Sequence, residues 1–464
     1  MKQISRNTDF TKGSIPRHLV LFTIPMIIGN LLQALYNTVD SIWVGRFLGK
    51  EALSAVTVSF PISFTLIALA LGLTQATTTL VSQYFGAGDM REVRKTIANS
   101  LVILSILAAI ISVVGILARF SLLRLINVPP DVMELAASYL QIYLTGLVPM
   151  FIFNAISAIL RGLGDSRSPL VFLAYATITN IILDPIMIFG VGPIPKMGVA
   201  GAALATVIAQ TLSAILALRY LIRADLLRLG KEMFYFDKRL TWITFRIGIP
   251  AGLQQVLVSL SGLAVSSIIN RFGSSVVAGF GVGQKIDQFA FLPAMSMGVA
   301  VSALVGQNLG AQRVDRVYES VKWSTILGGG ITGCVALFVL AFPGFLVSFF
   351  TTDANVLAVG TMYLRILSFA YVAFALMFTF GGVLRGAGDT IPTMLVTLIS
   401  LWMIRIPLAY YLSTIRGLGE RGAFLAIMFS PMVGVLLNYI YYKTGYWKRH
   451  KLTERSLQLG SVEE

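Results

Sequence analysis

The chain has 464 residues, of which 56% are hydrophobic and only 12% are charged. Soluble domains carry about 25% charged residues, so this composition excludes a soluble enzyme and a disordered chain. It also argues against a transmembrane barrel, whose strands alternate polar and apolar residues. In so apolar a chain, the net charge of +15 indicates basic loops beside a membrane rather than a nucleic-acid partner.

Few residues in the sequence are suited to catalysis or to holding a metal. Cys334 is the single cysteine, and His18 and His450 are the two histidines. Neither an internal disulfide nor a cysteine-based metal site is therefore expected. The sequence also contains no P-loop for binding nucleotide phosphates. We predict that the protein is not an enzyme and has no cofactor.

Apolar runs long enough to cross a bilayer as helices occur twelve times. The first half contains the runs 18–44, 52–83, 95–118, 133–158, 168–190 and 198–222. The second half contains the runs 242–269, 276–306, 318–344, 357–383, 391–413 and 420–442. The first run is too long for the core of a signal peptide, so we expect a retained helix.

The distribution of Lys and Arg predicts how the chain is oriented. If the N-terminus is inside, the inner segments contain 24 of these residues and the outer loops contain 8. The positive-inside rule then places both termini in the cytoplasm, and an even number of spans agrees with this. We expect a multi-pass protein of a prokaryotic-type inner (plasma) membrane.

The two halves of the sequence match each other at an offset of about 224 residues. The matching segments are Ile24-Pro25 with Ile249-Pro250, Arg46-Phe47 with Arg271-Phe272, LRGLGD at 160–165 with LRGAGD at 384–389, and Gly201-Ala202 with Gly422-Ala423. A six-helix repeat predicts an all-α fold of two bundles related by a pseudo-two-fold axis along the membrane normal, with a cavity between them. A static scaffold is the alternative, but two equal bundles on a polar linker suit alternating access better.

The repeat also predicts the domain boundaries. We expect an N-terminal six-helix bundle at 1–224, a cytoplasmic linker at 225–241, a C-terminal six-helix bundle at 242–444 and a cytoplasmic tail at 445–464. The linker mixes basic and aromatic residues, which suits the headgroup region of a membrane surface.

Polar side chains in the first helix are candidates for function, because polar and charged groups inside spans are costly. The residues Gln33, Tyr36 and Asp40 are spaced by three and four positions and share one helix face, with Asn37 beside them. The alternative is that Asp40 caps the helix at the outer surface.

The fifth helix of the first half contains a second polar group. Asn180 and Asp184 are four positions apart, Pro185 follows directly, and the sixth helix adds Thr206. Oxygen donors of these kinds suit a hard cation such as Na⁺, and two buried carboxylates can instead share a proton. The alternative for Asp184 is an Asp-Pro turn at the outer interface that ends the helix.

The second half lacks acids at the positions equivalent to Asp40 and Asp184. The run 276–306, which is the eighth of the whole chain, contains Gln284, Lys285, Asp287 and Gln288. The tenth and eleventh runs contain Arg365 and Arg405. The four residues of the eighth helix either line the cavity or pair with other helices for packing.

Several of these segments together resemble the multidrug and toxic compound extrusion (MATE) family over nearly the whole chain. The resemblance rests on Ile24-Pro25, on Asp40-Ser41-Ile42-Trp43-Val44-Gly45-Arg46, on the two LRGxGD segments and on Asn180 through Asp184-Pro185. The combination of Asp40, Asn180 and Asp184 is similar to the DinF branch. The NorM branch has an acid in its seventh helix, and the stretch Ala251–Val258 has none here.

The resemblance implies a secondary active antiporter that exports hydrophobic, mostly cationic drugs and dyes by alternating access, in exchange for H⁺ or Na⁺. It implies a coupling site formed by Tyr36, Asp40, Asn180, Asp184 and Thr206, where Asp40, Asn180 and Asp184 are the donors for Na⁺. We take Gln33, Asn37, Gln284, Lys285, Asp287 and Gln288 as candidates for the substrate cavity. The expected partners are organic cations and the lipid bilayer, and we expect the chain to act as a monomer without nucleic acid.

Two other functions compete with this reading. A flippase for a lipid-linked sugar carrier shares the wider superfamily architecture, but it should line its cavity with several Lys and Arg. The intramembrane cations are few, namely Lys285, Arg365 and Arg405. A receptor or membrane scaffold that transports nothing would need neither a repeat nor paired acids.

Overall fold

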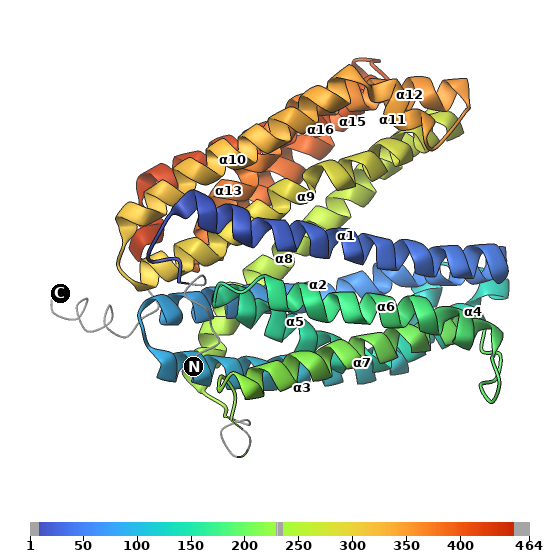
Figure 1. Ribbon diagram of the computed structural model, residues 1–464. Helices are drawn as coiled ribbons and strands as arrows, with labels where there is room; N and C mark the ends of the chain where they lie inside the picture. Colours follow the sequence, from blue (N-terminus) through green and yellow to red (C-terminus); the bar gives the residue numbers. More distant parts are fainter. Residues whose placement is uncertain (1–8, 229, 231–234, 450–464) are drawn as a thin grey trace. The chain divides into compact units, whose positions relative to one another are not determined.

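The computed structural model describes residues 9–228, 230 and 235–449, and these fold mainly into helices (Figure 1). The first half contains α1 (Ile15–Phe47), α2 (Lys50–Gly86), α3 (Met90–Leu125), α4 (Pro130–Thr145), α5 (Leu147–Gly162), α6 (Arg167–Phe189) and α7 (Val199–Arg223). The second half contains α8 (Lys238–Ile269), α9 (Ser274–Gly310), α10 (Val314–Ala341), α11 (Pro343–Ser348), α12 (Ala354–Leu367), α13 (Tyr371–Ala387), α14 (Thr390–Thr397), α15 (Ile406–Tyr410) and α16 (Glu420–Thr444). Of the predicted tail, residues 450–464 lie outside the described residues.

The helices of the described residues bear out the all-α membrane fold. Eleven helical segments are long and apolar enough to cross a membrane, and the bent pair α4 and α5 brings the number to twelve. This pair was expected as one span at 133–158, and its two helices meet at 47°. Pro149 has no N–H to continue the helical hydrogen bonds, and Gly146 at the break lies close against the Val207 side chain of α7.

Contacts divide the described chain into two compact units. Unit 1 contains residues 24–85 and 89–252, and unit 2 contains residues 9–23, 86–88 and 253–449. Consequently α1 and α8 each belong to both units, and the change falls next to Pro25 in α1 and next to Pro250 in α8. The contact units are not the same thing as the membrane-spanning bundles predicted from the sequence. They therefore do not test the predicted bundle boundaries, which stay a prediction.

Unit 1 is built around two hydrophobic clusters. One cluster joins α2, α3 and α4 through Ile62, Ala108 and Leu140. The other joins α1 and α6 through Val44 and Ile188, and α6 also packs along the length of α7 (Figure 1). Burial of these apolar side chains holds α1, α6 and α7 next to one another. The same helices contain the polar residues that were predicted to be functional.

Unit 2 has an aromatic core and a bound N-terminal segment. The Tyr363 ring lies edge to face against Phe280 and Phe424, with centroid distances of 5.4 and 5.0 Å. Arg316 of α10 donates hydrogen bonds to the carbonyl oxygens of Phe10 and Gly13, both at 3.0 Å. The start of α1 is therefore fixed within unit 2.

The two LRGxGD segments have the same geometry in each unit. Their second glycines, Gly164 and Gly388, adopt φ values of 85° and 84°, which only glycine adopts without strain. The acids that follow accept hydrogen bonds from tyrosines of α7 and α16. Tyr220 of α7 donates to Asp165 at 3.2 Å, and Tyr441 of α16 donates to Asp389 at 2.6 Å. The repeat inferred from the sequence is therefore present in the local structure.

The predicted orientation has a direct labelling test in a Cys334→Ala background, since Cys334 is the single, exposed cysteine. Val191 is 57% exposed after α6, and Lys238 is exposed at the start of α8. An impermeant maleimide should label Val191→Cys on intact cells and Lys238→Cys only after permeabilisation, because the positive-inside rule places these loops on opposite sides. Labelling of both from the same side would contradict the orientation.

Candidate functional site in unit 1

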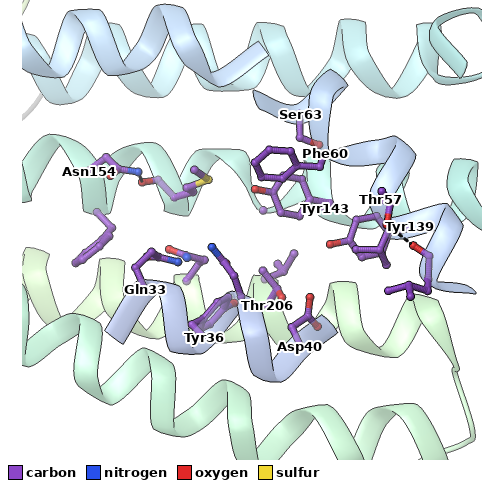
Figure 2. Close-up of a pocket in the computed structure, with 18 residues that line it drawn as sticks. Gln33, Tyr36, Asp40, Thr57, Phe60, Ser63, Tyr139, Tyr143, Asn154 and Thr206 are labelled. Carbon is purple, nitrogen blue, oxygen red and sulfur yellow. Dashed lines mark hydrogen bonds between the residues drawn. The ribbon is translucent and has the colours of Figure 1, made fainter. Parts of the chain in front are cut away.

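Unit 1 contains a cavity of about 470 Å³ between α1, α2, α4, α5 and α7 (Figure 2). Its polar lining comprises Gln33, Tyr36, Asn37, Asp40, Thr57, Ser63, Tyr139, Tyr143, Asn154, Thr206 and Gln210. Among the described residues that line it, Asp40 is the one charged side chain, and no Lys or Arg is present. The cavity thus combines aromatic and amide surfaces with a single acidic group.

Four lining residues come from the predicted polar face of α1. Gln33, Tyr36, Asn37 and Asp40 all line the cavity, and Figure 2 labels three of them on one helix. Asp40 is 8% exposed, and α1 continues beyond it to Phe47. The alternative that Asp40 caps a helix end at the surface is therefore wrong.

The second acid lies on α6, behind the cavity lining. Asn180 and Asp184 are fully buried, and the Asn180 side-chain amide donates a hydrogen bond of 3.0 Å to Asp184 Oδ1. The helix continues through Pro185 to Phe189, so the alternative of a helix-ending turn is wrong. Asp184 lies close enough to Asp40 for their charges to interact. Packing of α1 against α6 through Val44 and Ile188 thus brings together two acids that are 144 positions apart in sequence.

Three buried oxygens in this group have no hydrogen-bond donor among the described residues. They are Asp40 Oδ1, Asn180 Oδ1 and Asp184 Oδ2. Neither acid forms an ion pair within the described part of the chain. Two ionised carboxylates without a counter-ion are unfavourable in a low-dielectric site, and a proton or a metal cation removes that penalty. The three oxygens therefore have the chemistry of a cation site.

Tyr36 and Thr206 complete the predicted group. Both are buried, at 5% and 7% exposure, and both line the cavity. The Tyr36 hydroxyl lies next to Thr206 and within electrostatic reach of Asp40 and Asp184, although it makes no hydrogen bond of standard geometry. The structure therefore brings all five predicted coupling residues into one region; their role in coupling stays a prediction.

Sequence reasoning missed two tyrosines of α4. Tyr139 and Tyr143 line the cavity, and their rings stack with centroids 6.0 Å apart and planes at 15° (Figure 2). Both interact electrostatically with Asp40. Their spacing of four positions in an apolar run was a signal for one shared helix face. Stacked aromatic rings beside an acid form a surface suited to a flat cation.

The candidates on α9 do not line this cavity. Gln284, Lys285 and Gln288 are exposed, whereas Asp287 is 5% exposed. The hydroxyls of Tyr363 and Tyr371 donate hydrogen bonds to the two carboxylate oxygens of Asp287, at 2.7 and 2.5 Å. Asp287 thus joins α9 to α12 and α13, and unlike Asp40 and Asp184 it has a partner for each oxygen.

Asp287→Ala should lower the stability of unit 2. The change leaves two buried tyrosine hydroxyls without an acceptor, which costs about 2 to 5 kcal/mol in the free energy of unfolding. We expect a lower thermal midpoint for the purified protein in detergent and a smaller effect for Asp287→Asn, which keeps one acceptor oxygen. An unchanged midpoint for Asp287→Ala would show that these hydrogen bonds contribute little.

Duplicated apolar helices around buried acids, with no counter-ion among the described residues, are typical of membrane transporters. The family model MatE matches residues 25–186 and 250–411, which are the equivalent segments of the two halves. The chain belongs to the MatE family.

Similar proteins agree with this assignment over the full chain. The chain is 34% identical over 448 residues to a Bacillus subtilis protein named "Probable multidrug resistance protein YpnP", covering 96% of this chain and 98% of that protein. Crystal structures of MATE in the bent and in the straight conformation each superpose with a TM-score of 0.89 at 25% identity, covering 97% of this chain and 100% of theirs.

Proposed function

We propose that the protein is a multidrug efflux antiporter that exports hydrophobic organic cations in exchange for H⁺ or Na⁺. The observation that carries the proposal is the set of three buried oxygens of Asp40, Asn180 and Asp184, for which the described part of the chain offers no donor. A proton or Na⁺ entering this site neutralises charge that the surrounding residues leave uncompensated. The relatives named as multidrug resistance proteins support the same function.

The substrate class follows from the lining of the neighbouring cavity. Its volume of about 470 Å³ is in the range of drug-sized ligand sites. The stacked Tyr139 and Tyr143 offer aromatic surface, and Asp40 offers negative charge. An inbound H⁺ or Na⁺ and an outbound organic cation each bind to the ionised Asp40 carboxylate and neutralise it. They therefore compete for it, which is the basis of exchange.

Coupling requires that the ion binds the outward and inward states with different affinity, since equal affinity shifts no equilibrium. The proline positions Pro25 and Pro250 fall where α1 and α8 pass from one unit to the other. Prolines interrupt helical hydrogen bonds and allow bending at low cost. Neutralising Asp40 on α1 therefore acts on a helix that is already weakened at Pro25.

A flippase for a lipid-linked sugar carrier fits the cavity less well. Its anionic headgroup needs several cationic side chains, and the described lining of the unit 1 cavity has none. We also propose that the protein lies in the inner (plasma) membrane, where an exporter must act. The distribution of Lys and Arg indicates that both termini are in the cytoplasm.

The test is dye transport by purified protein in proteoliposomes. A gradient of H⁺ and a gradient of Na⁺ are imposed separately, and movement of a flat cationic dye is followed by fluorescence. We expect one gradient to drive dye movement against its concentration, and no movement of an anionic dye of similar size. Movement without either gradient, or equal transport of both dyes, would contradict the proposal.

A further inference from the structure

A second cavity of about 370 Å³ lies in unit 1 where the start of α3 meets residues 226–228 and Tyr235. Its lining includes Arg91, Arg94 and Lys95 from the first turns of α3, and Arg228 from the segment that follows α7. No carboxylate is part of this described lining. The pocket is therefore basic, in contrast to the acidic cavity described above.

Internal ion pairs neutralise only part of this positive charge. Arg94 and Arg228 both bind the carboxylate of Asp225, at 2.8 and 3.2 Å, and Lys95 binds Glu92. The hydrogen bond from Arg228, together with the charges of Arg228 and Arg94, holds the pKa of Asp225 below its usual range. Asp237 also interacts electrostatically with Lys95, so Arg91 and Arg94 are the cations of this pocket with the least compensated charge among the described residues.

Two arginine groups remain available to an anion. Arg91 is exposed and forms no ion pair with the described residues. The Arg94 Nε–H is buried at the pocket and has no acceptor within the described chain. Since arginine donors are rarely left without an acceptor when buried, this group points to a missing anionic partner.

Apolar residues form the other wall of the pocket. Leu226 and Leu227 line it beside the cations and are almost fully buried. The Tyr235 ring also lines it, with the Lys95 ammonium 6.0 Å from the ring centroid. A pocket with charges on one side and apolar groups on the other suits an amphiphilic anion better than a free inorganic ion.

The basic group does not belong to the internal repeat. At the offset of 224, Arg91, Arg94 and Lys95 correspond to Asp315, Tyr318 and Glu319. In unit 2, Arg316 follows Asp315 in the sequence and instead donates hydrogen bonds to carbonyl oxygens of the segment before α1. The cationic pocket is thus a property of unit 1 alone, and the duplicated architecture does not require it.

We propose that this pocket binds the phosphate group of an anionic lipid, with Arg91, Arg94 and Arg228 facing the phosphate and the half-buried Met90 and Tyr235 facing the glycerol and first acyl carbons. Juxtamembrane basic clusters attract anionic lipids, and each Lys or Arg near the headgroup adds to the affinity. The binding site is distinct from the acidic cavity, and it does not depend on the proposed antiport.

Calorimetric titration of the full-length protein in a neutral detergent tests the proposal. The probes are dihexanoyl-phosphatidylglycerol, dihexanoyl-phosphatidylcholine and inorganic phosphate. We expect phosphatidylglycerol to bind at least about tenfold more tightly than either other probe, because it alone combines a net negative charge with apolar contacts. If inorganic phosphate binds as tightly as phosphatidylglycerol, a lipid ligand is overturned.

Charge-removing variants locate the binding. Arg91→Gln/Arg94→Gln should weaken phosphatidylglycerol binding about 30-fold, and Arg91→Gln alone, which breaks no ion pair, about fivefold. The matched control Arg313→Gln/Lys322→Gln removes the same charge from α10 and the turn before it, and it should bind like the unmodified protein. The site would be overturned if the control lost as much phosphatidylglycerol affinity, or if neither Arg91→Gln/Arg94→Gln nor Arg91→Gln weakened the binding.

Discussion

Replacing Asp40 by Asn is expected to abolish gradient-driven export of a cationic dye while the yield of purified protein stays unchanged. Asn has nearly the same shape as a protonated Asp, so the packing of α1 is preserved. The variant, however, has no charge for a proton or Na⁺ to neutralise. Asp40 is 8% exposed and its Oδ1 has no donor among the described residues, so no hydrogen bond to that oxygen is lost. Transport should fall at least about 100-fold, to the passive background.

The comparison series places this effect in unit 1. Asp184→Asn should be nearly as severe, because Asp184 belongs to the same group of oxygens. Asp287→Asn should keep most of its transport, because Asp287 is bonded to two tyrosines in unit 2. The measurements are drug resistance of expressing cells, dye transport in proteoliposomes and protein yield. Normal export by Asp40→Asn together with inactivity of Asp287→Asn would place coupling in the second half.

Gly72→Ala is expected to destabilise unit 1 strongly. A Cβ atom at Gly72 would lie 2.2 Å from the carbonyl oxygen of Gly248 and 2.3 Å from the backbone nitrogen of Gly252. Backbone atoms cannot move aside as a flexible side chain can, so α2 and α8 must separate. Overpacking of this kind costs about 1 to 3 kcal/mol, and contact with backbone places this site at the upper end.

The matched control for Gly72→Ala is Gly262→Ala, which lies on α8 with nothing within 4 Å of the added atom. We expect a lower thermal midpoint and a lower yield of monodisperse protein for Gly72→Ala, and values like the unmodified protein for Gly262→Ala. Equal midpoints for the two variants would show that the close approach of α2 and α8 contributes little to stability.

Local patterns in the sequence were sufficient for the spans and for the polar face of α1. A helix that crosses a bilayer must satisfy its backbone internally and present apolar side chains, so length and hydropathy identify it without knowledge of its neighbours. Helical spacing likewise placed Gln33, Tyr36 and Asp40 on one face, and all three line the cavity. The repeated LRGxGD segments predicted an internal repeat, and Gly164 and Gly388 adopt matching backbone conformations in the two halves.

Contacts between distant segments were decided by the tertiary structure alone. The stacking of Tyr139 and Tyr143 beside Asp40, and the two tyrosine hydrogen bonds to Asp287, depend on which helices pack together. Periodicity within one helix says which side chains share a face, but not which face of another helix lies opposite. The same limit explains why the basic pocket around Arg94 was not foreseen, since it needs α3 and a segment more than 130 positions away to meet.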